Sequence, residues 1–149
     1  ILGILILGVI GYVAIVMFGL GSSGGGYDGP EIDITYDNFE EQMMRQSLVH
    51  DIPKDGIIKL SFYNFDSGDR EIEESYVLTK GNVVKGSEAG DIEIQIHSKY
   101  LAELTNKNFC SVVPSAKANG DMITDSKLST SKLSWKYKGM FKYRDCLGF

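Results

Sequence analysis

Histidine and cysteine, which often carry acid–base or nucleophilic catalysis, are rare in this sequence, with two residues of each. The candidates are the histidines His50 and His97 and the cysteines Cys110 and Cys146. Histidine titrates near neutral pH and a thiolate is a strong nucleophile, so a Cys110–His97 pair is conceivable. No local sequence brings these two residues together, and both histidines fall where we expect the end of a helix or strand. We therefore expect solvated or capping histidines and a protein that is not an enzyme.

Metal binding has equally little support. Asp66 and Asp69 flank a Ser-Gly turn and could offer two carboxylates to calcium, but calcium takes six to eight oxygen ligands. Cys110 and Cys146 belong to no Cys-x-x-Cys pair, which a zinc or redox motif would require. We expect a plain turn at residues 66–69, no metal site and no cofactor.

The two cysteines leave two outcomes open. In an oxidising compartment Cys110 and Cys146 could form one disulfide, whose loop closure would stabilise the fold by about 3–4 kcal/mol. In a reducing compartment, two free thiols are expected.

The C-terminal part combines aromatic and basic residues. The aromatic cluster could simply pack into the core, or it could form an apolar pocket or a subunit contact; it consists of Trp135, Tyr137, Met140 and Phe141. Six basic residues lie between Lys127 and Arg144, and we interpret them as a solvated strand face. The formal net charge of the whole chain is −5, which argues against nucleic acid as a partner.

These side chains must be positioned by an α+β domain over residues 31–149. Apolar and polar residues alternate at 58–63, 72–79 and 92–96, which predicts strands, and 83–84 could begin a further short strand. We expect helices over 39–49 and 98–105, a broken helix around Phe109 and a short strand or extended entry at 32–36. Alternation at Leu133, Trp135 and Tyr137 predicts a last strand. The predicted architecture is an antiparallel sheet with one face covered by helices.

The first twenty residues contain no charge and no proline, and as a helix they would span about 30 Å. Such a segment must be buried in lipid or in an assembly of its own copies. The residues that we expect to face that environment are Ile1, Leu5, Gly8, Gly11, Ala14, Ile15 and Phe18. A flexible linker over residues 21–30 should decouple this helix from the domain. Its hinge glycines are Gly21, Gly24, Gly25 and Gly26.

Two stretches resemble known families. The N-terminal layout, ILGILILGVIGYVAIVMFGL followed by GSSGGG, resembles mature archaeal type IV pilin-like proteins, which begin after leader removal with an uncharged helix. That resemblance implies a filament whose core is made of the N-terminal helices.

The domain resembles the sterol-carrier-protein-2 (SCP2-like) fold. The segments that carry this resemblance are FEEQMMRQSL (39–48), IIKLSFYNF (57–65), SYVLTKGNVVKG (75–86), DIEIQIHSKYLAELTNKN (91–108) and KLSWKYKGMFKY (132–143). It implies an N-terminal helix, an antiparallel sheet, a strand running into a helix and a closing strand. It also implies an apolar ligand site lined by sheet and helix residues.

From these patterns we expect a subunit of a surface filament, assembled from copies of itself through residues 1–20. The alternative is a single-pass membrane protein whose domain binds a lipid or other apolar ligand, and an accessory subunit of a membrane complex is a third possibility. In each case membrane lipid is an expected partner, and the expected location is the membrane or the cell surface.

Overall fold

The computed structural model describes residues 29–147. The predicted helix over residues 1–20 and the hinge glycines therefore lie outside the described residues. Within residues 29–147, no helix is long and apolar enough to cross a membrane.

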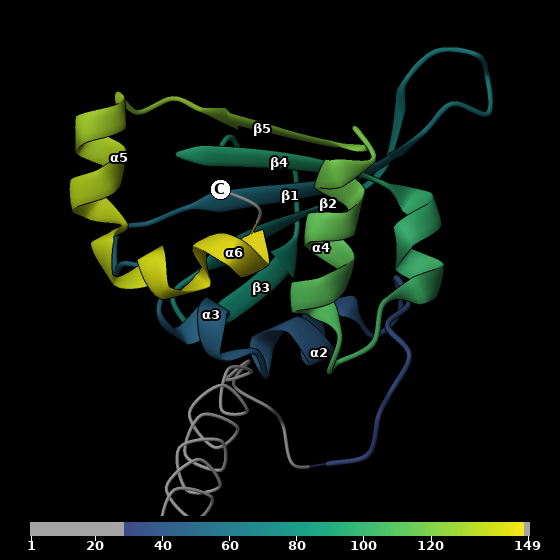
Figure 1. Ribbon diagram of the computed structural model, residues 1–149, viewed down its shortest axis with the longest axis horizontal. Coiled ribbons are helices and arrows are strands. Elements are labelled where there is room, and N and C mark those ends of the chain that lie inside the picture. Colours follow the sequence, from purple (N-terminus) through teal and green to yellow (C-terminus); the bar gives the residue numbers. More distant parts are fainter. Residues whose placement is uncertain (1–28, 148–149) are drawn as a thin grey trace, which may run out of the picture.

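The described chain is an α+β domain built on a five-stranded sheet with the order β3-β2-β1-β4-β5 (Figure 1). The strands are β1 (Ile58–Asn64), β2 (Glu71–Thr79), β3 (Asn82–Lys85), β4 (Ile92–His97) and β5 (Met122–Ser126). The strands predicted at 58–63, 72–79, 83–84 and 92–96 are confirmed. In β4, for example, Ile92, Ile94 and Ile96 are buried, as a half-buried strand requires.

The sheet is mixed, so the prediction of a purely antiparallel sheet was wrong. β1 pairs with β2 in antiparallel and with β4 in parallel orientation. To run parallel to β1, the chain after β3 must return to the end at which β1 begins. Gly90 permits this return, since a Cβ there would lie 2.8 Å from the backbone nitrogen of Lys59. A period of two identifies the buried face of a strand but says nothing about the direction of its neighbour.

The helices cover one face of this sheet (Figure 1). They are α2 (Phe39–Met44), α3 (Ser47–His50), η1 (Ser98–Glu103), α4 (Phe109–Ala118), α5 (Thr130–Lys136), η2 (Lys138–Tyr143) and α6 (Arg144–Leu147), where η denotes 3-10 helices. α4 and α6 pack side by side over the middle of the sheet.

The strand predicted at Leu133, Trp135 and Tyr137 was wrong, because these residues lie in and just after helix α5. The apolar residues that face inward are Leu133, Tyr137 and Met140, a spacing of four and then three that fits a helical face. Trp135 falls between them and is exposed. The alternation of Leu133, Trp135 and Tyr137 in the sequence therefore does not reflect a strand.

Smaller differences concern the other helices and edges. The helix predicted over 39–49 is divided into α2 and α3 at Gln46, whose backbone is extended (φ −76°, ψ 131°). Residues 32–36 form an extended entry with one isolated bridge, Asp33 to Thr105. The predicted broken helix is continuous as α4, with Pro114 inside it. The edge strand β5 was not predicted.

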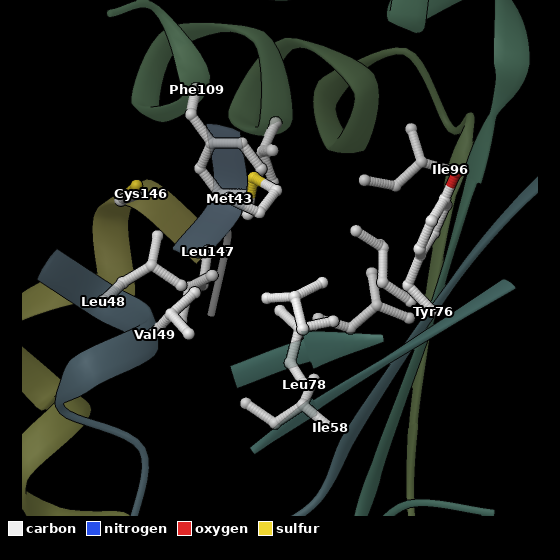
Figure 2. Close-up of a cluster of buried hydrophobic side chains, with 14 of the residues drawn as sticks. Met43, Leu48, Val49, Ile58, Tyr76, Leu78, Ile96, Phe109, Cys146 and Leu147 are labelled. Carbon is white, nitrogen blue, oxygen red and sulfur yellow. The ribbon is translucent and has the colours of Figure 1, made fainter. Parts of the chain in front are cut away.

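One hydrophobic core joins the sheet to the helices. Side chains from the helices, such as Phe109 and Leu147, face strand residues such as Ile58 and Leu78 (Figure 2). The members of this core lie between Ile34 and Leu147. A fragment that begins after the glycine-rich linker therefore contains every core residue within 29–147 and should fold on its own.

Candidate ligand-binding cavity

An apolar cavity of about 580 Å³ lies between the inner face of the sheet and the C-terminal helices. Its floor is formed by β1, β2 and β4, and the floor residues are Ile58, Leu60, Leu78, Ile92, Ile94 and Ile96. Its sides come from α3 and α4, through Leu48, Phe109 and Val113. β1 and β4 each supply a row of branched side chains, because every second residue of a strand points to the same face, and β2 adds Leu78.

Residues 127–147, which we call the C-terminal strap, close the cavity on the side opposite the sheet. The strap contains α5, η2 and α6, and it lines the cavity with Leu133, Ser134, Tyr137, Met140, Phe141, Arg144 and Leu147. Of the cavity-lining residues within 29–147, Arg144 is the one that carries a charge. The lining is therefore apolar over nearly its whole extent.

The predicted aromatic cluster is thus divided. Tyr137, Met140 and Phe141 lie together at the cavity, whereas Trp135 lies on the outer side of the strap with 75% of its surface exposed. Sequence reasoning did not identify the floor of the cavity, since the isoleucines of β4 read only as a buried strand face.

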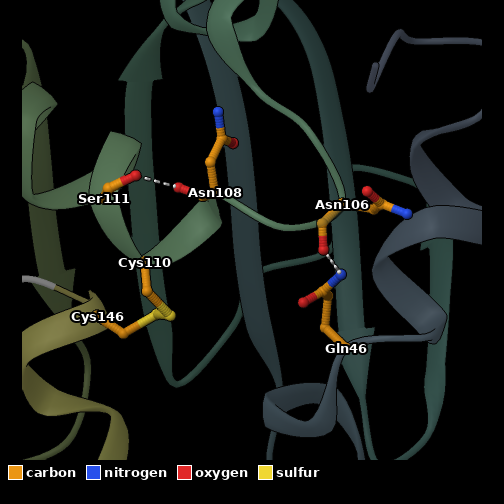
Figure 3. Close-up of a disulfide and its surroundings, with 6 residues drawn as sticks. All are labelled: Gln46, Asn106, Asn108, Cys110, Ser111 and Cys146. Atoms are coloured by element: carbon orange, nitrogen blue, oxygen red, sulfur yellow. Dashed lines mark hydrogen bonds between the residues drawn. A yellow bond between two sulfur atoms is a disulfide. The ribbon is translucent and has the colours of Figure 1, made fainter. Parts of the chain in front are cut away.

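A disulfide between Cys110 and Cys146 fastens the strap to α4 (Figure 3). Cys110 is the second residue of α4 and Cys146 lies in α6, so the bond joins the last helix of the strap to the helix that forms a side of the cavity. The same bond removes the thiol that the conceivable Cys110–His97 nucleophile pair would need. The Nδ1 atom of His97 instead accepts a hydrogen bond from the backbone N–H of Lys99 (3.2 Å) and caps η1.

A partly buried carboxylate, Asp91, holds the middle of the strap. The Tyr137 hydroxyl donates to Asp91 Oδ2 (2.8 Å) and the ammonium of Lys136 lies 2.8 Å from the same oxygen. Burial acts to raise the pKa of Asp91, but the hydrogen bonds from Lys136 and Tyr137 outweigh it and hold this pKa below its usual value. Burial and the adjacent carboxylate raise the pKa of Tyr137, which therefore stays protonated as a donor.

A second carboxylate, Asp51, holds the later part of the strap. It accepts a hydrogen bond from the Tyr143 hydroxyl (2.5 Å) and pairs with the ammonium of Lys142 (2.8 Å). These two contacts lower the pKa of Asp51. Lys127 at the start of the strap also pairs with Glu93 (3.3 Å), so covalent and ionic contacts attach the strap along its length.

No protein-family model and no curated protein sequence matches this chain. The function of the cavity must therefore be argued from its geometry and from the sequence.

A polar cluster lies outside the cavity, around the carboxylate of Glu73. It accepts hydrogen bonds from the side chains of Tyr36, Asn64 and Ser98, which come from the entry segment, β1 and η1. The hydrogen bonds from Tyr36 and Asn64 are the main reason that the pKa of Glu73 is lowered. A carboxylate with its oxygens engaged in this way is suited to joining segments rather than to abstracting a proton.

The Asp66–Asp69 turn contains Gly68 in the left-handed region (φ 92°), where glycine is favoured. Within residues 29–147, no group of three or more His, Cys, Asp or Glu side chains is placed to hold a metal ion.

Proposed function

We propose that the domain binds an apolar ligand in the cavity between the sheet and the C-terminal strap. The observation that carries this proposal is the cavity itself, since its volume of about 580 Å³ falls within the roughly 300–1,000 Å³ typical of small-molecule sites. Well-packed domains hold few voids larger than a water molecule, so a space of this size needs an explanation.

The chemistry of the lining indicates what kind of molecule fits. The polar side chains at the cavity are Ser134, Tyr137 and Arg144. The Tyr137 hydroxyl is already engaged by Asp91, and Arg144 is largely exposed at the edge, with 68% of its side chain accessible. A ligand with several buried polar groups would leave them without partners, which costs about 1–3 kcal/mol for each. An apolar body with at most one polar end fits best.

The SCP2-like resemblance supports the same proposal. It implies an apolar ligand site lined by sheet and helix residues, and an element order in which a helix precedes the sheet and a strand runs into a helix. α2 precedes β1, and β4 runs directly into η1. The closing strand that the resemblance implies at 132–143 is absent there, because this stretch is helical. In the proposed protein, residues 1–20 anchor the domain to a membrane, which supplies apolar molecules.

Native mass spectrometry of a fragment of residues 27–149 tests this function. The expected result is a bound apolar molecule after gentle purification, or reloading of the delipidated fragment with a long-chain alcohol in a ratio of about one to one. A folded fragment that neither retains nor takes up such a molecule would contradict the proposal.

A filament subunit is the second candidate. It is supported by the uncharged residues 1–20 and the adjoining glycine-rich linker, both sequence observations. In that protein, helices of many copies bury residues 1–20 in a common core and the domain forms the outer layer. Electron micrographs of the native membrane fraction should show filaments that carry this protein; dispersed membrane-bound monomers would exclude this candidate.

A further inference from the structure

The outer side of the C-terminal strap exposes large aromatic side chains. Trp135, with 75% of its surface accessible, is the most exposed large hydrophobic residue within residues 29–147, and Phe141 is 52% exposed. The remaining exposed large hydrophobic residues lie elsewhere: Phe65 in the loop after β1, Ile72 on β2 and Val84 on β3. Two such residues within one short segment of the strap therefore require an explanation beyond chance exposure.

The same segment is strongly basic. Residues 127–147 contain six Lys or Arg residues and one acidic residue, Asp145, although the chain as a whole has a formal net charge of −5. Lys132 and Lys138 are exposed on the strap, whereas Lys142 pairs with Asp51 and Arg144 with Asp145. The ammonium of Lys138 lies 4.5 Å from the centre of the Trp135 ring, so one cation and the exposed indole form a single surface feature.

We propose that the outer side of the C-terminal strap docks on the surface of a membrane that contains anionic lipids. Tryptophan prefers the headgroup level of a bilayer, where its ring is apolar and its N–H remains hydrated. Lysine and arginine beside it are attracted by anionic headgroups, as in interfacial amphipathic segments. Separate aromatic side chains among cations suit this partner better than the continuous apolar centre of a subunit interface.

Docking of the strap would also affect the position of the cavity relative to the membrane. Phe141 and Arg144 line the cavity and are also exposed, so they mark the edge where the cavity meets the outside. A docked strap would hold this edge close to the lipid. Docking goes beyond the proposed ligand binding and does not require it, because Lys132, Trp135 and Lys138 do not line the cavity.

The experiment uses the full chain with lipid vesicles and takes Trp135, the one tryptophan in the chain, as the reporter. Vesicles of phosphatidylcholine alone are compared with vesicles in which part of that lipid is replaced by phosphatidylglycerol. Both kinds carry a spin-labelled lipid that quenches tryptophan near the headgroups. We expect several-fold stronger quenching and a blue-shifted emission in the anionic vesicles, both reversed by high salt.

The double variant Lys132→Gln/Lys138→Gln should abolish most of this difference. The matched control Lys85→Gln/Lys107→Gln makes the same change of charge on β3 and before α4, and it should behave like the unmodified chain. Circular dichroism of these three proteins checks that they are equally folded.

Equal quenching in neutral and anionic vesicles would overturn the proposal, as would loss of quenching in the control variant. A blue shift without vesicles that grows with protein concentration would show contact between copies and would also overturn it. A negative result of the vesicle experiment leaves the mass-spectrometric test of ligand binding unaffected, so the two proposals can fail separately.

Discussion

Replacing Ile94 by phenylalanine should weaken ligand binding without loss of stability. Ile94 lies in the middle of β4 and its side chain forms part of the cavity floor. In a filled core an added ring would cost about 1–3 kcal/mol of stability through overpacking. In the cavity the ring has room, so the free energy of unfolding should change by less than about 1 kcal/mol.

The effect on affinity follows from the volume. A space of about 580 Å³ holds roughly 20 non-hydrogen atoms, if each takes about the 30 Å³ of a water molecule in the liquid. At about −0.3 kcal/mol per atom, such a ligand gains about −6 kcal/mol, which corresponds to a Kd of about 40 µM. Phenylalanine adds about three non-hydrogen atoms to the floor and displaces as many of the ligand, which costs about 0.9 kcal/mol and weakens binding about fivefold.

The assay is a fluorescence titration of the 27–149 fragment with anilinonaphthalene sulfonate, an aromatic dye whose emission rises in apolar surroundings. Urea unfolding followed by circular dichroism gives the stability of the same samples. The control, Ile72→Phe, makes the same change at an exposed position of β2 and should alter neither quantity. A variant Ile94→Phe that binds the dye normally and is destabilised by more than about 1 kcal/mol would show that this space is closed in solution.

Four further predictions concern the attachments of the fold. Replacing Cys110 and Cys146 together by alanine should lower the free energy of unfolding by about 4 kcal/mol, since the disulfide closes a loop with a sequence separation of 36; reducing agent should produce a similar loss in the unmodified fragment and none in the variant. Replacing Tyr137 by phenylalanine removes a hydrogen bond to a carboxylate and should cost about 2 kcal/mol in urea unfolding at pH 7. The pKa of Asp91 is lowered in the folded state, so its contribution to stability is present above the unfolded pKa of about 4 and is lost as the pH falls through the folded pKa. The variant Asp91→Asn should therefore show a flatter decline of the free energy of unfolding in acid. Replacing the buried Asn106 by alanine should cost about 2 kcal/mol, because its side chain binds the backbone of the entry segment at two points; a loss of under about 0.5 kcal/mol would show that water replaces it.

The sequence predicted those parts of the fold in which local chemistry decides the outcome. β1 and β4 were predicted because a half-buried strand requires alternation, and Ile92, Ile94 and Ile96 supply it. The parallel pairing of these strands was not predicted, because it depends on the path between β3 and β4, where Gly90 passes close to the backbone of Lys59. The spacing of apolar residues within a strand carries no information about such a path.

The candidate site was predicted only in part for a related reason. Tyr137, Met140 and Phe141 were recognised as an apolar group, but their alternation with Trp135 suggested a strand. Reading Leu133, Tyr137 and Met140 together would have indicated a helix instead. The cavity floor could not have been predicted, because a buried isoleucine has the same sequence pattern whether it meets another side chain or a space.

The attachments of the strap indicate how a ligand could enter. The disulfide at Cys146 and the contacts of Asp51 with Lys142 and Tyr143 hold the later part of the strap, and Asp91 holds its middle at Tyr137. Releasing the whole strap would require breaking a covalent bond and several ionic contacts, which is costly for each opening. Phe141 lies between these attachments, is half exposed and lines the cavity. Rotation of this one side chain requires no attachment to break, so entry beside Phe141 is the path that the fold leaves open.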